Sequence, residues 1–246
     1  MSSHSTGTRP ITSSVRDPKT VDRTRTAALL VSDVTNPFYA DVVIGVEEVA
    51  SSGGYEVFLC NTAYDLDRGM AFIRSLIDKR VDGVLVMSSR MSDAWLNELR
   101  RSDVPAVVLD WNVANECGYL ASLHIDFAQG ITTAVEHLMA LGHRRFAHIS
   151  GPRGMPTARL RRECFLDALA ERGIDRSSVL VVEGDLQIQG GRQAARQIVA
   201  ASDRPTAILA ANDLTAIGAL NGLRSAGIAV PEDMTIDGID NIWLSD

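Results

Sequence analysis

Short apolar runs alternate with longer amphipathic stretches along the chain from Thr26 onward. Each run is too short for a buried helix and is rich in Val, Ile or Leu, as expected of strands covered on both faces. The runs are AALLV (27–31), YEVFLC (55–60), GVLVM (83–87), AVVLD (106–110), LASLHID (120–126), FAHIS (146–150), VLVVE (179–183), TAILAA (206–211) and MTIDGI (234–239). This pattern predicts nine strands.

The stretches between these runs carry apolar residues at helical spacing. In FYADVVIGVEEVA, for example, the apolar residues include Val42, Val46 and Val49. FLDALAERGI and ALNGLRSAGI each end in Gly followed by Ile, so Gly173 and Gly227 are expected to form left-handed helix C-caps. Strand–helix alternation of this length predicts right-handed βαβ units and parallel sheets.

Five predicted strands precede about residue 125 and four follow it. One continuous nine-stranded sheet and two smaller sheets both fit this order. We favour two doubly wound α/β subdomains, 26–125 and 126–246, facing each other across a ligand cleft, because parallel strands place binding loops at their carboxyl ends. Polar residues follow these strand ends, namely Asp33, Asn36, Asn61, Asp110, Asp126, Asn212, Asp213, Asp240 and Asn241. Any one of them alone is also typical of a helix cap or a turn.

Composition narrows the class of protein. The 246 residues are 46% hydrophobic with a formal net charge of -7, which argues against nonspecific nucleic-acid binding. The three cysteines show no metal-ligand spacing and suggest a reduced compartment. No apolar run approaches the roughly 20 residues that span a bilayer. Residues 1–25 are polar, without the apolar core of a secretory signal, so we expect a disordered or linker tail and a cytoplasmic protein without membrane partners.

Catalytic signatures are missing from the sequence. It contains no GxxxxGKS/T phosphate cradle, GxSxG elbow or HExxH motif, and no GxGxxG follows the first predicted strand. We therefore predict neither an enzyme nor a cofactor or metal site. His143 and His148 lie near Arg144 and Arg145, and we interpret this cationic cluster as a partner of a helix dipole rather than as catalytic.

Two segments suggest a ligand site. In SGPRGMPTARLRREC, three arginines near a helix start oppose the helix dipole, so at least one should have a specific partner. Arg161 precedes Phe165 by four residues and should share the inward side of the helix, whereas Arg159 and Arg162 can be solvated. In SDVTNPFYADVV, an Asn-Pro step precedes two aromatic residues at another helix start.

Several segments together resemble the effector-binding core of the lactose-repressor (LacI/GalR) family of transcription regulators, which is itself similar to periplasmic sugar-binding proteins. They appear in order as SDVTNPFYADVVIGVEEVASSGGYEV, RVDGVLVM, VPAVVLDW, EHLMALGHRRFAHISGP, ARLRRECFLDAL, AANDLTAIGAL and GIAVPEDMTIDGID. The resemblance extends from about Thr26 to the C-terminus. It implies a periplasmic-binding-protein-like type I fold, with two subdomains and a hinge.

The resemblance also implies a function and a site. The cleft would close on a small-molecule effector, a sugar or another metabolite, in a homodimer that regulates transcription. By position, the effector-lining residues would be Phe38, Tyr39, Asp110, Trp111, Thr157, Arg161, Asn212 and Asp240. For Phe38 and Tyr39, an alternative is that they only staple the first helix to its sheet.

Two departures from the family pattern affect this hypothesis. The first 25 residues lack the periodicity of a helix-turn-helix headpiece, and the chain stops soon after GIDNI, where the family usually continues. DNA binding is therefore expected only if a headpiece is supplied, and the alternative is a free-standing small-molecule-binding protein. Leu186 stands where the family can place an aromatic that stacks on the effector, which argues against a purine ligand.

Overall fold

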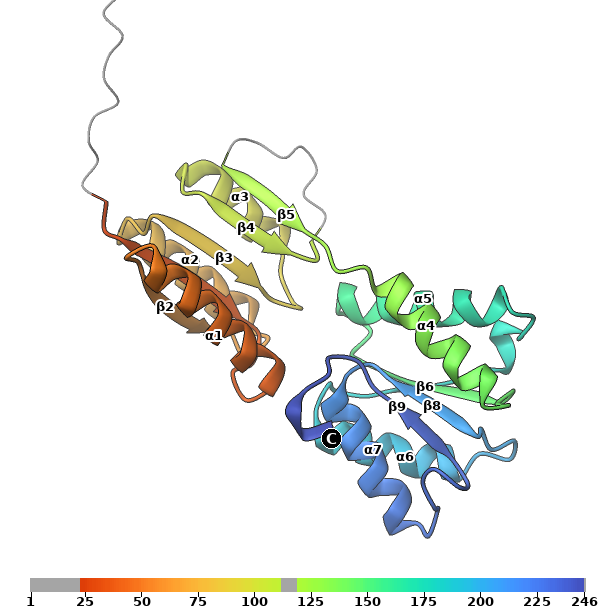
Figure 1. Ribbon diagram of the computed structural model, residues 1–246. Helices are drawn as coiled ribbons and strands as arrows, with labels where there is room; N and C mark the ends of the chain where they lie inside the picture. The colour runs from red at the N-terminus through yellow and green to blue at the C-terminus, as the bar shows by residue number, and fades with distance from the viewer. Residues whose placement is uncertain (1–22, 112–118, 246) are drawn as a thin grey trace, which may run out of the picture.

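The computed structural model describes residues 23–111 and 119–245. These residues form two lobes (Figure 1). Each lobe holds one sheet of parallel strands that is covered by helices. Most of the predicted tail, residues 1–22, lies outside the described residues, as does Cys117. The predicted α/β class with two doubly wound subdomains is confirmed, and the alternative of one continuous nine-stranded sheet is wrong.

The first lobe holds a five-stranded sheet in the order β2-β1-β3-β4-β5. Its strands are β1 (Thr26–Val31), β2 (Glu56–Asn61), β3 (Gly83–Met87), β4 (Ala106–Leu109) and β5 (Leu120–Leu123), and its helices are α1 (Pro37–Ser52), α2 (Leu66–Asp78) and α3 (Asp93–Ser102). Side chains alternate between the two faces of β1. Leu29 and Val31 pack under α1, while Ala28 and Leu30 join the core beneath α2 and α3.

The second lobe holds a four-stranded sheet in the order β7-β6-β8-β9. Its strands are β6 (Phe146–Ser150), β7 (Leu180–Glu183), β8 (Ala207–Ala210) and β9 (Thr235–Asp237), and its helices are α4 (Phe127–Ala140), α5 (Pro156–Ala170), α6 (Ile188–Val199) and α7 (Asp213–Ser225). Short 3₁₀ turns cover Arg176–Ser178 and Trp243–Ser245. Helices α4 and α5 pack on one face of the sheet, and α6 and α7 on the other.

Sequence periodicity predicted these elements well, because all nine apolar runs form strands that pair in parallel. Gly173 and Gly227 have φ of +83° and +77°, as left-handed C-caps require. The division predicted at residues 125 and 126 falls in the connection between Leu123 and Phe127. None of the helices in the described part of the chain is long and apolar enough to cross a bilayer.

Helices α6 and α7 approach each other closely because small residues line their contact. A Cβ atom added to Gly218 would lie only 2.0 Å from the backbone oxygen of Ile188, and one added to Gly191 would lie 2.1 Å from that of Thr215. Both helices start at the edge of the sheet that faces the first lobe, directly after Gln187 and Asn212 respectively. Close packing of the pair therefore fixes the loops that precede them.

We expect Gly218→Ala to lower the free energy of unfolding by about 1–3 kcal/mol, because a methyl group there forces backbone of α6 away from α7. Gly130→Ala in α4 is the matched control, since nothing lies within 4 Å of its added Cβ atom. That change should stabilise the protein by about 0.5–1 kcal/mol through helix propensity. Urea unfolding of both variants measures the difference, and equal effects of the two substitutions would contradict the close packing.

Candidate functional site

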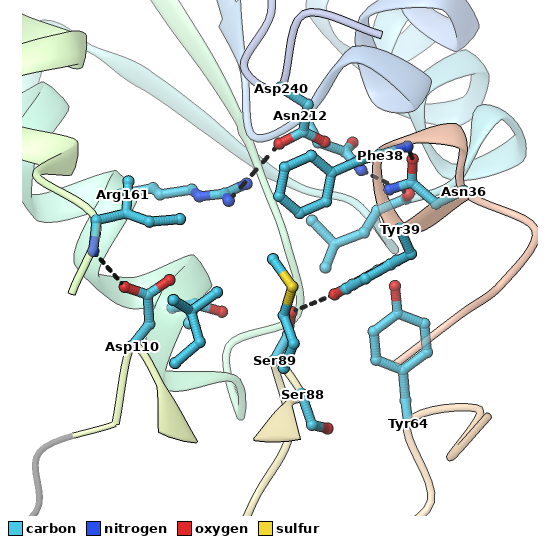
Figure 2. Close-up of a pocket in the computed structure, with 15 residues that line it drawn as sticks. Asn36, Phe38, Tyr39, Tyr64, Ser88, Ser89, Asp110, Arg161, Asn212 and Asp240 are labelled. Carbon is cyan, nitrogen blue, oxygen red and sulfur yellow. Dashed lines mark hydrogen bonds and ion pairs between the residues drawn. The ribbon is translucent and has the colours of Figure 1, made fainter. Parts of the chain in front are cut away.

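A cavity lies between the two lobes, where loops from both sheets meet (Figure 2). Its free volume is ≈ 40 Å³, which is room for a few water molecules. The lining combines hydroxyl, amide and carboxyl groups with a few apolar side chains. The lining residues are Asn36, Phe38, Tyr39, Tyr64, Met87, Ser88, Ser89, Leu109, Asp110, Ile125, Thr157, Arg161, Leu186, Asn212 and Asp240.

The Asn-Pro step before α1 directs two aromatic residues into this cavity. The Asn36 side chain caps the helix by accepting a hydrogen bond from the backbone N–H of Phe38 at 3.1 Å, with Pro37 as the first helical residue. Tyr39 is only 5% exposed and packs against Leu29 and Val31. Its hydroxyl shares a hydrogen bond of 3.1 Å with Ser89. Tyr39 therefore belongs to the core through its ring and to the cavity through its polar end.

Arg161 is the cation of the cavity, and its side chain is 14% exposed. Its Nη1 donates to the backbone oxygen of Ala211 at 2.5 Å, and its Nη2 lies 3.8 Å from Oδ1 of Asp240. The guanidinium carbon stands 4.5 Å from the centre of the Phe127 ring, in a cation–π contact. The arginine expected to have specific partners near the start of α5 is thus Arg161, while Arg159 is exposed.

Two carboxyl groups enter the cavity from opposite lobes. Asp240, which follows β9, is mostly buried, and this burial raises its pKa to about 6 despite the nearby Arg161 cation. Asp110, which follows β4, accepts the backbone N–H of Ile125 at 2.8 Å. Burial also raises the pKa of Asp110. Both are non-glycine residues with positive φ, 54° at Asp110 and 127° at Asp240, a conformation that is sterically costly and often found at functional sites.

Asn212 is almost fully buried, and its side chain serves mainly to hold the surrounding loops. Its Oδ1 caps α7 by accepting the backbone N–H of Thr215 at 3.0 Å and the hydroxyl of the same residue at 2.5 Å. Its Nδ2 donates to the backbone oxygen of Leu186 at 3.0 Å. One N–H hydrogen of the amide is left for another partner.

Seven of the eight residues predicted for the site line the cavity, and Trp111 does not. Trp111 packs, partly buried, against the core of the first lobe. The backbone at Asp110 is left-handed, so the chain turns between these neighbours and sends only the carboxyl group toward the cavity. For the other seven, contact with an effector stays a prediction.

Sequence reasoning missed several lining residues. Ser88 and Ser89 directly follow β3, so a search for polar residues after each strand would have found them. Tyr64 had no such signal. Ala63 and Tyr64 both have positive φ, 51° and 58°, and Tyr64 packs across the cleft against a second-lobe cluster that contains Leu186. Burial raises the pKa of the Tyr64 hydroxyl.

Direct polar contacts also join the two lobes at the rim. Nε2 of Gln187 donates to Oδ2 of Asp33 at 2.9 Å, and these residues lie 154 positions apart in the chain. The same carboxylate accepts the backbone N–H and the hydroxyl of Thr35, which holds it in place. The bond between Gln187 and Asp33 exists only while the lobes are close together.

The described residues contain no group of three or more His, Cys, Asp or Glu side chains that could hold a metal ion. The cavity therefore offers hydrogen bonds, one cation and two carboxyl groups as its chemistry. It has the composition of a site that binds and orients a small polar molecule.

Known families and proteins match this chain over most of its length. Residues 24–242 match the family described as periplasmic binding proteins and sugar binding domain of LacI family. A relative from Photobacterium profundum, the HTH-type transcriptional repressor PurR, is 38% identical over 90% of this chain. The chain spans 66% of that relative's length.

Solved structures of similar proteins include complexes with sugars. A LacI family transcriptional regulator from Enterococcus faecium with bound ribose is 30% identical, with a TM-score of 0.77, over 88% of this chain and 78% of that chain. The complex of the transcriptional regulator CelR with cellobiose is 31% identical, with a TM-score of 0.78, over 89% of this chain and 68% of that one. These relatives are named as regulators rather than as enzymes.

The raised pKa of Asp240 predicts how the free energy of unfolding depends on pH. The ordinary value is 3.8 and the folded value is about 6, so the native state keeps this proton to a higher pH than the unfolded state does. The associated stabilisation is fully present below about pH 4 and is lost as the pH rises to about 6. We expect Asp240→Asn to be more stable than the unmodified protein at pH 7, by up to about 3 kcal/mol, with the difference vanishing near pH 4.

Asp65 provides a control of opposite sign. Its carboxylate accepts the backbone N–H groups of Arg68 and Asp67, and these bonds lower its pKa. Its contribution to stability is therefore present above the unfolded pKa and lost as the pH falls. Asp65→Asn, which cannot titrate, should not lose stability in this way at low pH. Urea unfolding between pH 3.5 and pH 7.5 measures both variants. An Asp240→Asn protein less stable than the parent at pH 7 would mean that the ion pair with Arg161 outweighs burial.

Proposed function

The chain belongs to the family of periplasmic binding proteins and LacI-type sugar-binding domains, and on this premise we propose that it is the effector-sensing part of a transcriptional regulator. Its effector is a neutral, hydroxyl-rich small molecule, a sugar or a metabolite of similar size, held in the cavity between the lobes. The observation that carries this proposal is the cavity itself, whose polar groups come from loops of both sheets.

The charges of the cavity favour a neutral effector over an anionic one. Its one cation, Arg161, already has the Asp240 carboxyl group and a backbone oxygen as partners, and Asp110 adds a second carboxyl group. A phosphate or carboxylate would meet two acids for one shared arginine. Hydroxyl groups can instead donate to the carboxylates and accept from the arginine, while Phe38 covers the apolar face of a sugar ring.

The proposed mechanism is a shift between separated and closed lobes. The bond between Gln187 and Asp33 and the packing of Tyr64 against the second-lobe cluster that contains Leu186 favour the closed arrangement. The free volume is only ≈ 40 Å³ in this arrangement, so we expect the lobes to separate when an effector enters. An effector that touches both lobes then binds one arrangement better than the other and changes their populations. Where a DNA-binding headpiece is present, that change would alter operator binding.

We also propose that the protein acts as a homodimer through α1 and the neighbouring edge strand β2. Ile44, Val49 and Phe58 are large, exposed apolar residues on these two elements. Two-fold symmetric dimers are the commonest soluble assemblies and bury such patches.

Sedimentation velocity at micromolar concentration should show a species of twice the chain mass, and Val49→Lys should convert it to a monomer, because a buried lysine loses its hydration. Leu141→Lys is the control, since Leu141 is also apolar and exposed but lies on the second lobe. A parent protein that sediments as a monomer would exclude the dimer.

Binding is tested with a panel of neutral sugars and nucleosides beside sugar phosphates. We expect at least one neutral compound to raise the melting temperature, and Arg161→Ala to weaken its binding by at least about tenfold, equivalent to about 1.4 kcal/mol. Arg161→Lys should also bind weakly, because an ammonium group lacks the planar fork of donors. Arg159→Ala, two residues away on the exposed side of α5, should bind as the parent does.

Isothermal titration of the parent and the three variants gives the affinities. A cooperative melt with no shift from any neutral compound, or unchanged affinity in Arg161→Ala, would reject the proposal. A shift produced only by the sugar phosphates would reject its neutral-effector part.

A further inference from the structure

His148 lies in the middle of β6 and is completely buried. Its interpretation as part of a cationic cluster at a helix end is therefore wrong, because α4 already ends at Ala140. The imidazole faces α5, and its ring centre is 5.3 Å from that of Phe165. A polar ring in this position of the core needs hydrogen-bond partners.

One imidazole nitrogen has a partner and the other has none. Nδ1 is 2.8 Å from the backbone oxygen of Leu209, and since a carbonyl only accepts, Nδ1 must carry the proton. Nε2 is then an acceptor, and it is buried without a partner. Burial lowers the pKa of His148 to about 4, so the ring is neutral at neutral pH.

The complementary atom belongs to Arg161. Its Nε–H is a donor and is likewise buried without a partner, although Nη1 and Nη2 of the same guanidinium have theirs. These two nitrogens are the only buried side-chain N or O atoms in the described part of the chain that lack a hydrogen bond. Both residues adjoin Phe165, because Arg161 precedes it by one turn of α5 and the His148 ring packs beside it.

We propose that His148 is a positioning residue for Arg161, its Nε2 and the Nε–H of the guanidinium being joined through one bridging water molecule, which accepts from Nε–H and donates to Nε2. This contact satisfies both orphaned atoms at once, and a buried polar atom without a partner is costly. It anchors the inner edge of the guanidinium and leaves one N–H on each outer nitrogen for the cavity. The link to effector binding rests on the function proposed above; the contact itself does not.

The contact is tested in the full, ligand-free chain by ¹⁵N NMR. The Arg161 Nε–H resonance is identified by its absence in Arg161→Lys. Its hydrogen should exchange slowly with water. Its chemical shift should change in His148→Phe, which keeps a ring but removes the acceptor. His148→Gln, whose side-chain oxygen can accept again, should restore the parent chemical shift. If the phenylalanine variant does not fold, the slow exchange of the Arg161 Nε–H and the His148 tautomer, both measured in the parent, decide the test. Long-range ¹H–¹⁵N correlations should show His148 with its proton on Nδ1 at neutral pH.

His143 provides the matched control. Its two ring nitrogens bond the hydroxyls of Thr206 and Thr235, at the amino ends of β8 and β9 and away from the cavity. His143→Phe should lower stability without moving the Arg161 resonance. An Arg161 resonance that is unchanged in His148→Phe, or a His148 proton on Nε2, would overturn the proposal.

Affinity separates this inference from the proposed function. With a neutral compound that binds the parent, we expect His148→Phe to raise its Kd about tenfold and His143→Phe to change it less than about twofold. Failure of every compound to bind would reject the proposed function and leave the NMR result to decide the contact. Unchanged affinity in His148→Phe despite a shifted resonance would reject the positioning role.

Discussion

A single guanidinium group, buried between two lobes, is the constraint on which the cavity depends. Arg161 stands near the amino end of α5, where the helix dipole opposes a positive charge, so its partners must outweigh both the dipole and burial. They come from three places: a carbonyl beyond β8, a ring at the start of α4 and a carboxyl group beyond β9. The partners of this one cation therefore come from the ends of β8, α4 and β9, which meet at one point.

Much of the cavity is made of groups that also hold the fold together. Asn36 and Asn212 cap helices, and the Tyr39 ring is part of the first-lobe core. The close contact of α6 with α7 holds the loops before them, which contribute Leu186 and Asn212. A site built in this way is rigid within each lobe, and its freedom lies in the distance between the lobes.

Apolar periodicity was enough to predict the strands, the helices and their parallel order, because buried α/β sheets leave a strong and repeated pattern. The residues after each strand were predictable for the same reason, since topology alone places them at one edge. Trp111, Tyr64 and His148 were not predictable. The first two depend on left-handed backbone at non-glycine residues, and the last depends on which strand face a polar ring occupies. Neither leaves a trace in residue spacing.

Left-handed conformations at Tyr64, Asp110, Leu186 and Asp240 surround the cavity. An isolated left-handed residue with a side chain disfavours folding by roughly 1 kcal/mol compared with glycine. Favourable contacts elsewhere in the fold must offset the strain of these four residues. Glycine at these positions would relieve the backbone strain, but it would also remove side chains that line the cavity. Stability and ligand discrimination are therefore opposed at this rim.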